Sequence, residues 1–215
     1  MSMAQQSSPT SAVDAIRRPM SSKDLRKAVG KLLRGPQPLP IVQAGHPVLR
    51  EVAQPYDGEL SPELMADLVE AMKASMHAAP GVGLAAPQVG LGLALAVVED
   101  SGDDDDDPRE RSELPFRVIV NPSYSPVDAS GAAVDVEAAE RAVFEEGCLS
   151  VVGYEAEVAR FRSVRVVGQD ETGRAFDDVL HGWSARIMQH EIDHLGGGLY
   201  IDKADLASLS WTGRV

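Results

Sequence analysis

Cysteine and basic residues are scarce in this chain, and both shortages limit the compartments and the binding partners that we expect for it. Its single cysteine, Cys148, excludes an intrachain disulfide and fits a reducing cytosol. Only 20 Lys and Arg residues stand against 33 Asp and Glu residues, which gives a formal net charge of −13. Because an acidic surface repels phosphate groups, we expect no direct nucleic acid binding and no docking on an anionic membrane.

Long apolar runs are also absent from the sequence. No stretch approaches the roughly 20 apolar residues of a transmembrane helix, and Met1–Thr10 is polar where a secretion signal would be apolar. We therefore expect a cytoplasmic protein. The 215 residues, of which 44% are hydrophobic, suffice for one globular domain with a real core, or for one domain plus tails.

Composition divides the chain into three expected parts. Residues 1–39 form an N-terminal extension that is flexible or partly helical, with a helix expected over Ser22–Leu33. Residues 40–205 form the compact domain, and residues 206–215 form a short C-terminal tail. The acidic run Asp103–Asp107 is typical of a solvated surface loop.

Periodicity predicts an α+β fold in which antiparallel strands surround two main helices. Ser61 and Pro62 are typical of a helix start, and apolar residues at helical spacing follow until about residue 79. A second helix is expected from about Val179 to Leu195, where three glycines end it. The expected strands are Leu93–Val98, Phe116–Val120 and Glu157–Val167.

The run from His190 to His194, His-Glu-Ile-Asp-His, carries the strongest chemical signal. Positions four apart lie on one helix face, so the two imidazoles can hold one metal ion. The carboxylate of Glu191 projects close by and can take a proton from a metal-bound water. The pattern favours metal-assisted hydrolysis, and the alternative is an amphipathic helix with two chance histidines.

Two further segments offer groups that such a site needs. Cys148 lies in the turn-like run Glu145–Ser150 and could be the third ligand, although a buried core cysteine is the alternative. The glycine-rich run Gly81–Gly90 lets the backbone approach a ligand closely. Its amide side chain, Gln88, could donate to a developing oxyanion, and the alternative is a tight helix-to-strand connection with a solvated Gln88.

Three linked motifs in this order resemble those of the peptide deformylases. They are Gly81–Gln88 (Gly-Val-Gly-Leu-Ala-Ala-Pro-Gln), Glu146–Ser150 (Glu-Gly-Cys-Leu-Ser) and His190–His194, and the resemblance spans roughly residues 40–202. It implies an α+β fold with antiparallel β-sheets around a central metal-binding helix and with a second, N-terminal helix. Residues 40–205 would then be the catalytic domain of a peptide deformylase.

The resemblance also implies roles for individual residues. The metal ligands would be Cys148, His190 and His194, and Glu191 would act as general base and then as general acid. The ion would be one Fe(II) per chain, for which Zn(II), Ni(II) or Co(II) can substitute. The oxyanion would be held by Gln88 and the backbone N–H of Leu149, and the peptide site would be lined by Val82, Gly83 and Gly147.

The function implied by the resemblance is hydrolysis of the formyl group from the N-terminal formyl-methionine of newly synthesised proteins, with release of formate. The expected partners are formyl-methionyl nascent peptides, and a transient contact with the ribosome is compatible with the resemblance. A zinc endopeptidase and a non-catalytic metal-binding protein are the alternatives. The endopeptidases usually take a downstream Glu or His as third ligand, whereas Cys148 lies upstream of the histidine pair.

Other polar residues carry weaker expectations. His46, His77 and His181 lie outside the motifs, and we expect surface or structural roles for them. Asp193 lies at the edge of the ligand-bearing helix face, where it could support a ligand through a neighbour or form a plain salt bridge. Val152 stands in a loop near the substrate where relatives often carry proline, so specificity could differ there.

Overall fold

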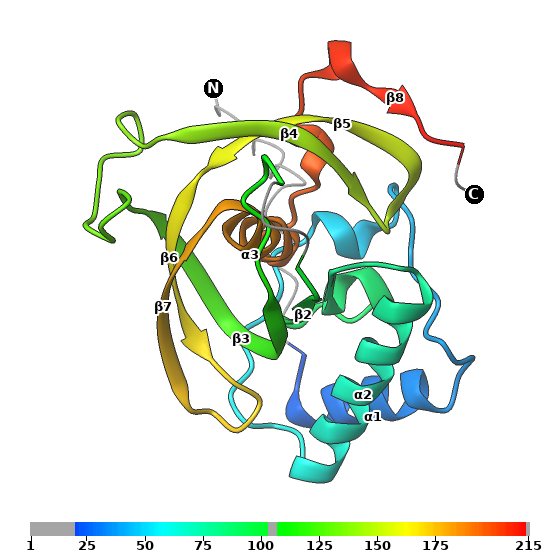
Figure 1. Ribbon diagram of the computed structural model, residues 1–215. Coiled ribbons are helices and arrows are strands. Elements are labelled where there is room, and N and C mark those ends of the chain that lie inside the picture. The colour runs from blue at the N-terminus through cyan, green and yellow to red at the C-terminus, as the bar shows by residue number, and fades with distance from the viewer. Residues whose placement is uncertain (1–19, 103–106, 214–215) are drawn as a thin grey trace, which may run out of the picture.

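The computed structural model describes residues 20–102 and 107–213, and within these ranges two α-helices come first, followed by seven strands, a third α-helix and a short last strand (Figure 1). The α-helices are α1 (Ser22–Leu33), α2 (Pro62–Ala78) and α3 (Gly182–Leu195). The strands are β1 (Gly83–Ala85), β2 (Leu95–Asp100), β3 (Leu114–Pro126), β4 (Arg141–Cys148), β5 (Val151–Phe161), β6 (Ser163–Gln169), β7 (Ala175–His181) and β8 (Ser210–Trp211).

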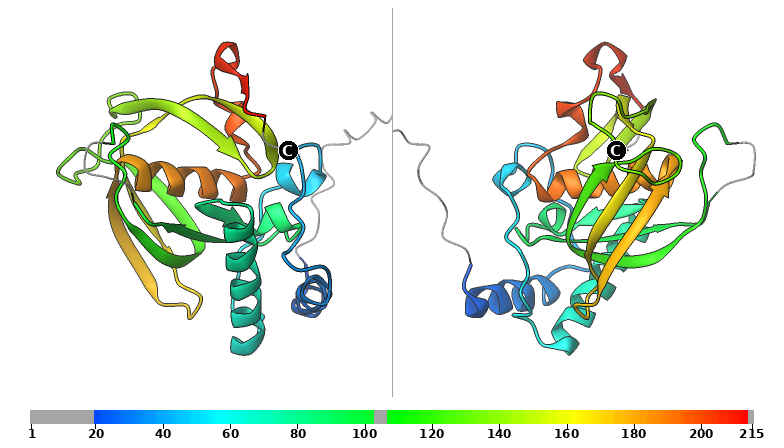
Figure 2. Two further views of the ribbon diagram at one scale, coloured as in Figure 1. Left: turned by 45° about the vertical axis from the view of Figure 1, so that its right-hand side comes forward. Right: turned by 90° about the vertical axis from the view of Figure 1, so that its left-hand side faces the viewer.

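Helix α3 lies between two antiparallel sheets. One sheet has the strand order β1-β2-β3-β6-β7, and the other has the order β4-β5-β8. Figure 2 shows α3 running beneath the β4–β5 hairpin, with β3, β6 and β7 curving around its other side. This arrangement confirms the expected α+β fold with a central helix, and it leaves β1 and β4 as free edges on either side of α3.

Helix α2 forms where the sequence predicts it. The Ser61 hydroxyl accepts a hydrogen bond from the N–H of Leu64, and Pro62 occupies the first turn. Its apolar face is buried in a core that also contains β1, β2 and part of β3. The buried face consists of Met65, Leu68, Val69, Met72 and Met76.

The start of α3 was predicted three residues too early. Val179, Leu180 and His181 belong to β7 and pair with residues 163–165 of β6. Their exposure alternates along the strand, so a period of two continues up to His181. The chain turns at Gly182, whose φ of 55° lies in the left-handed region, and the helix begins there.

Two segments near the centre of the chain also differ from the prediction. The expected single strand Glu157–Val167 is divided between β5 and β6, which belong to different sheets. The run Glu145–Cys148 is the end of β4 rather than a turn, and the turn is confined to Leu149 and Ser150. Both differences arise because long-range strand pairing, which local sequence does not reveal, decides where each strand ends.

Helix α1 forms within the predicted extension and packs against α2 (Figure 2). Its residues Leu25 and Val29 are fully buried in the same core as α2. The division of the chain at residues 39 and 205 stays a prediction, and residues 1–19 and 103–106 lie outside the described residues. No helix within the described ranges is long and apolar enough to cross a membrane.

The burial of Leu25 predicts that α1 contributes to the stability of the whole domain. Leu25→Ala should lower the free energy of unfolding by about 2–5 kcal/mol, the cost of removing a buried leucine side chain. Urea denaturation measures this change, and exposed Lys27→Ala on the same helix serves as control. A loss below about 0.5 kcal/mol would mean that α1 unfolds independently of the domain.

Candidate metal centre

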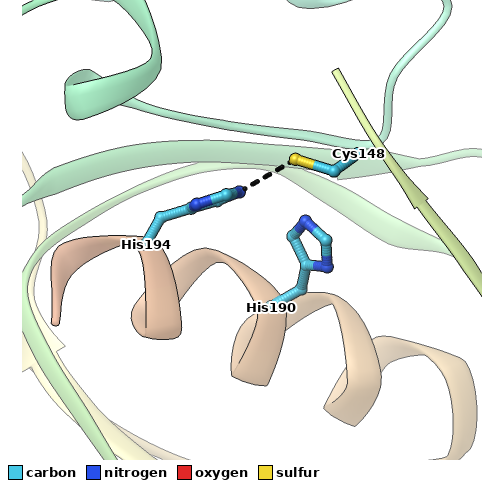
Figure 3. A group of neighbouring side chains, drawn as sticks. All are labelled: Cys148, His190 and His194. Atoms are coloured by element: carbon cyan, nitrogen blue, oxygen red, sulfur yellow. Dashed lines mark hydrogen bonds between the residues drawn. The ribbon is translucent and has the colours of Figure 1, made fainter. Parts of the chain in front are cut away.

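Three potential metal ligands converge on the face of α3 that lies under β4. His190 and His194 are one helical turn apart on α3, and Cys148 is the last residue of β4 (Figure 3). The Cys148 Sγ lies 3.3 Å from His194 Nε2, and the ligand atoms of all three residues lie within 4.8 Å of one another. Small side-chain rotations would bring all three to the bond lengths of about 2.0–2.3 Å that a divalent ion requires.

Cys148 reaches this position because the chain reverses directly after it. Cys148 pairs with Val151 across the two-residue turn of Leu149 and Ser150. The N–H of Ser150 donates a hydrogen bond to the Cys148 sulfur at 3.4 Å. A thiolate that accepts such a bond is stabilised, and the half-buried sulfur faces α3.

Gln88 is held in one orientation beside the sulfur. The side chain is 1% exposed, and its Oε1 accepts a hydrogen bond from the N–H of Ala85 at 2.8 Å. Its Nε2 therefore points the other way and lies 3.6 Å from Cys148 Sγ and 3.4 Å from Ser150 Oγ. The structure thus excludes the solvated-Gln alternative and places an amide donor next to the Cys148 sulfur.

Glu191 is a buried carboxyl group directly beside the ligand pair. Within the described part of the chain, its Oε2 is buried and has no hydrogen-bond partner. Burial raises the pKa of Glu191 to about 7, although the charges of His190 and Arg160 oppose this shift. A Cβ atom at Gly83 would lie 2.2 Å from Glu191 Oε1, so the carboxyl group fits only because residue 83 is glycine.

Glu146, to which the sequence analysis assigned no role, supports the metal ligand His190. Its Oε2 accepts a hydrogen bond from His190 Nδ1 at 3.1 Å, which leaves Nε2 of the imidazole to face Cys148. The signal was available, because Glu146 stands two residues before Cys148 and alternate residues of a strand share a face. Two arginines, Arg160 and Arg186, hold the carboxylate from the other side.

Charges in this cluster shift the pKa values of its members. Burial alone would raise the pKa of Glu146, but hydrogen bonds from His190 and Arg160 lower it far below its usual range. Burial lowers the pKa of His190, but its hydrogen bonds to Cys148 and Glu146 outweigh this and raise the pKa to about 10. Both shifts describe the protein groups alone, and a bound cation would favour neutral imidazoles.

Asp193 extends the cluster to the protein surface. Its carboxylate lies 2.7 Å from Arg160 Nη1 and 2.6 Å from Lys203 Nζ, and it accepts a hydrogen bond from the Tyr124 hydroxyl. Arg160 also binds Glu146, which in turn accepts a hydrogen bond from His190. The salt-bridge alternative is confirmed, and the support of a ligand through Arg160 and Glu146 stays a prediction.

The three remaining histidines have local partners away from the ligand triad. His46 caps the short helix Pro47–Arg50, His77 lies 2.5 Å from the carboxylate of Glu99, and His181 lies 2.8 Å from the Ser163 hydroxyl. These contacts agree with the surface or structural roles expected for them.

Residues of the expected peptide site line the two free sheet edges. Gly83 begins the edge strand β1 and Val82 directly precedes it, and Gly147 lies on the edge strand β4. A Cβ atom at Gly81 would lie 2.8 Å from Leu149 Cδ1, so the glycine-rich segment touches the turn after Cys148. Gly83 lies against Glu191 of α3, and the individual roles of these residues remain predictions.

The residues present fit a divalent metal ion of borderline softness. A thiolate and two imidazoles are donors that Fe(II), Zn(II), Ni(II) and Co(II) accept, whereas Mg(II) and Ca(II) prefer oxygen. Three protein ligands would leave a coordination position for water, and the neighbouring Glu191 has a buried oxygen without a hydrogen-bond partner among the described residues. Fold and site together define a metal-dependent hydrolase.

Comparison with known proteins identifies the family of hydrolases to which this chain belongs. The family model of the polypeptide deformylases matches residues 38–209. Peptide deformylase 1 of Streptomyces coelicolor is 53% identical over 195 residues, which cover 89% of this chain and 85% of that protein. The human mitochondrial peptide deformylase is 34% identical over 209 residues, which cover 92% and 82% of the two chains.

Solved structures agree with the sequence comparison. A class I type b peptide deformylase from Acinetobacter baumannii superposes with a TM-score of 0.66 at 32% identity, over 77% of this chain and 98% of that one. The chain belongs to the polypeptide deformylase family and is an enzyme of that type. The expected family resemblance is confirmed.

The three-ligand geometry predicts that metal binding depends on Cys148. Cys148→Ala should abolish stoichiometric tight binding, because two imidazoles alone hold a divalent ion weakly. The metal content of the purified protein, measured by elemental analysis after dialysis, tests this, and His77→Ala should retain full occupancy. Full occupancy in the Cys148→Ala protein would exclude the thiolate as a ligand.

Proposed function

We propose that this deformylase-family enzyme removes the formyl group from the N-terminal formyl-methionine of newly synthesised proteins and uses Glu191 as its proton carrier. The observation that carries the proposal is the buried Oε2 of Glu191, which has no hydrogen-bond partner among the described residues and belongs to the residue next to His190 in the triad Cys148, His190 and His194. A purely structural metal site does not require such a group. The direct test is formate release from formyl-Met-Ala-Ser by Fe(II)-loaded protein prepared without oxygen.

Glu191 has the position and the pKa for proton transfer in both directions. A bound divalent ion would lower the pKa of the attacking water and would polarise the formyl C=O bond. Glu191 takes the proton from that water as the new C–O bond forms, and it returns the proton to the amine when the C–N bond breaks. A carboxyl pKa near 7 lets the same group accept and then donate at neutral pH.

Gln88 and the turn after Cys148 are proposed to stabilise the negative charge on the former formyl oxygen. The Gln88 amide is already fixed by Ala85, so no reorganisation is needed when the charge develops. The N–H of Leu149 is the second proposed donor, since Leu149 directly follows the ligand Cys148. These donors would act mainly on the transition state and less on substrate binding.

The peptide substrate is proposed to bind as an added strand between β1 and β4. Both strands are sheet edges, and edge strands present backbone N–H and C=O groups to an extended peptide. Val82 and Gly83 would pair with the substrate on one side and Gly147 on the other. The exposed backbone at Gly147 and the absence of a side chain there favour such a close approach.

We propose Fe(II) as the resident ion, one per chain. The donor set supports a borderline ion in general, and the choice of iron rests on the family resemblance. Reconstitution of metal-free protein with Fe(II), Zn(II), Ni(II) or Co(II) under anaerobic conditions would compare the activities. An enzyme that works only with Zn(II) would exclude the iron assignment.

The partners and location of the enzyme are proposals of the same kind. Formyl-methionyl nascent peptides are the proposed substrates, a transient contact with the ribosome would bring them to the site, and the cytoplasm is the proposed compartment. Assays of formate release and of internal peptide cleavage on the same peptide would show that the enzyme acts on the formyl group and not as an endopeptidase.

Replacement of Glu191 tests the proton carrier. Glu191→Gln preserves shape and burial but cannot accept a proton, so kcat should fall at least ~10²-fold. The metal content should stay the same, because Glu191 is not among the ligands. Exposed Glu70→Gln serves as control for handling and charge. Near-normal turnover of Glu191→Gln would remove this residue from the mechanism.

Replacement of Gln88 tests the oxyanion donor. Gln88→Leu keeps similar bulk and removes the amide, so kcat should fall by ~10²–10³-fold, the range for one oxyanion-hole donor. KM for a formyl-methionyl peptide should change much less, because the contacts with the two sheet edges remain. A raised KM with an intact kcat would instead identify Gln88 as a substrate-positioning residue.

A further inference from the structure

Helix α1 and the residue that caps it carry a row of basic side chains along their exposed side. Five of the 20 basic residues of the chain stand in residues 23–34, against a single acidic residue, Asp24. At about 100° per residue, the five side chains cover an arc of about 140° around the helix axis. This row, called the α1 basic face below, consists of Lys23, Arg26, Lys27, Lys31 and Arg34.

The opposite side of α1 is used for packing. Leu25 and Val29 are buried in the core that α1 shares with α2, and Leu32 and Leu33 pack against the same core. All exposed residues of α1 are polar, namely Ser22, Lys23, Asp24, Arg26, Lys27 and Lys31. The α1 basic face therefore presents charge to a partner, and α1 has no exposed apolar side chain.

Salt bridges account for most basic side chains elsewhere in the protein but for none on the α1 basic face. Outside this face, nine basic side chains bind a carboxylate: Arg50, Arg109, Arg111, Arg117, Arg160, Arg162, Arg165, Arg186 and Lys203. Among the described residues, no carboxylate pairs with the α1 basic face, and Arg26 donates only to the backbone carbonyl of Glu59. The charges of this face are thus left to the solvent.

The spacing of the lysines does not favour the helix itself. Lys23, Lys27 and Lys31 follow one another at intervals of four residues, and like charges at this spacing destabilise a helix. The helix dipole favours basic residues only in the last turn, where Lys31 lies, and it disfavours Lys23 in the first turn. Helix stability therefore does not explain this row, whereas a bound polyanion would relieve the repulsion within it.

The length of the α1 basic face matches an extended polyanion better than a single small anion. From Lys23 to Arg34 the helix rises about 16 Å, at about 1.5 Å per residue. A nucleic acid duplex presents several phosphates over that length, since B-form DNA carries one charge per about 1.7 Å of its axis. A membrane also presents many phosphates, but helices that lie in a membrane surface insert an exposed apolar face, which α1 lacks.

The net charge of −13 predicts no nucleic acid binding, but this charge is unevenly distributed along the chain. At physiological salt, charges are screened over about 8 Å, so a phosphate close to α1 responds mainly to the side chains nearby. Helix α1 lies at the opposite end of the molecule from the β4–β5 hairpin (Figure 1, Figure 2). A partner bound to α1 would therefore leave this hairpin uncovered.

We propose that the α1 basic face binds the phosphate backbone of duplex RNA without regard to base sequence. The choice of RNA rests on the proposed function, because the ribosome that makes new proteins is rich in RNA. The charge and exposure of this face do not depend on that function. An enzyme held in this way would stay close to the nascent peptides on which it is proposed to act.

Fluorescence anisotropy of a labelled RNA hairpin, titrated with the full-length, metal-loaded protein, tests the proposal. Binding should weaken by roughly 10²-fold between 50 and 200 mM salt, as expected for about four phosphate contacts. A DNA hairpin of the same sequence should bind no more tightly than the RNA. The proposal would be overturned by absence of RNA binding at 50 mM salt, by tighter binding of the DNA, or by binding to phosphatidylglycerol vesicles without binding to RNA.

Neutralising the three lysines tests whether RNA binds at α1. The variant Lys23→Gln/Lys27→Gln/Lys31→Gln keeps residues that favour a helix, so it should fold like the wild type, which circular dichroism checks. Its RNA affinity should fall at least ~10-fold, and the slope of log Kd against log salt should fall by about three, one for each lost phosphate contact. Unchanged affinity in the folded variant would place RNA binding elsewhere and overturn the proposal.

A second variant separates local contact from general attraction. Arg50→Gln/Arg165→Gln/Arg174→Gln removes the same charge from exposed positions outside the α1 basic face. It should bind RNA like the wild type. Equal weakening in both triple variants would overturn the proposal, since long-range attraction would then explain the binding.

Formate release from formyl-Met-Ala distinguishes this proposal from the proposed function. The lysine variant should release formate at the wild-type rate, because the metal ligands lie on α3 and β4. If the wild type releases formate but does not bind RNA, the α1 proposal fails and the proposed function stands. If it binds RNA through α1 but releases no formate, the proposed function fails and the α1 basic face remains an RNA-binding surface.

Discussion

The metal centre depends on the contacts of one buried carboxylate, that of Glu146. It lies on β4, yet it binds Arg160 of β5 and both Arg186 and His190 of α3. One side chain therefore ties together the hairpin that carries Cys148 and the helix that carries the histidines. Removing one partner of such a buried network typically costs about 3–5 kcal/mol, because the remaining charges are left uncompensated. The position of the ligands is thus coupled to the stability of the domain.

Two glutamates close to the metal centre are held in opposite states by their surroundings. Arginines and an imidazole surround Glu146 and keep it ionised, which lowers its pKa. Glu191 has no such partners, and burial raises its pKa to about 7. The first carboxylate can therefore orient a ligand permanently, while the second remains available to exchange a proton. Gly83 makes this possible, since any side chain there would occupy the space of Glu191.

The two sheets contribute their free edges rather than their faces to the proposed substrate site. β1 and β4 each end a sheet, and α3 lies between the two sheets (Figure 1). Such exposed edges are normally protected against pairing with other chains. Within the described residues β1 and β4 each lack a strand partner on one side, so an extended peptide could pair with either edge.

Local sequence determined much of this protein. The spacing of His190 and His194 requires only helix geometry, and the Ser61-Pro62 start and apolar period of α2 are equally local. Combined with the Gly81–Gln88 and Glu146–Ser150 segments, these signals sufficed to predict the family. The order of residues along one strand or one helix is enough for such inferences.

Only the tertiary structure decided the features that depend on contacts between distant segments. Val179–His181 continue a strand because β6 pairs with them, and the Glu157–Val167 segment is divided because its halves pair in different sheets. The support of His190 by Glu146 crosses 44 residues of sequence, and the β2–β3 connection is held by contacts of Arg111 with Asp100 and of Arg109 with Trp183. Local propensity is silent on such pairings, because their free energy comes from burial and charge contacts that exist only once the chain has folded.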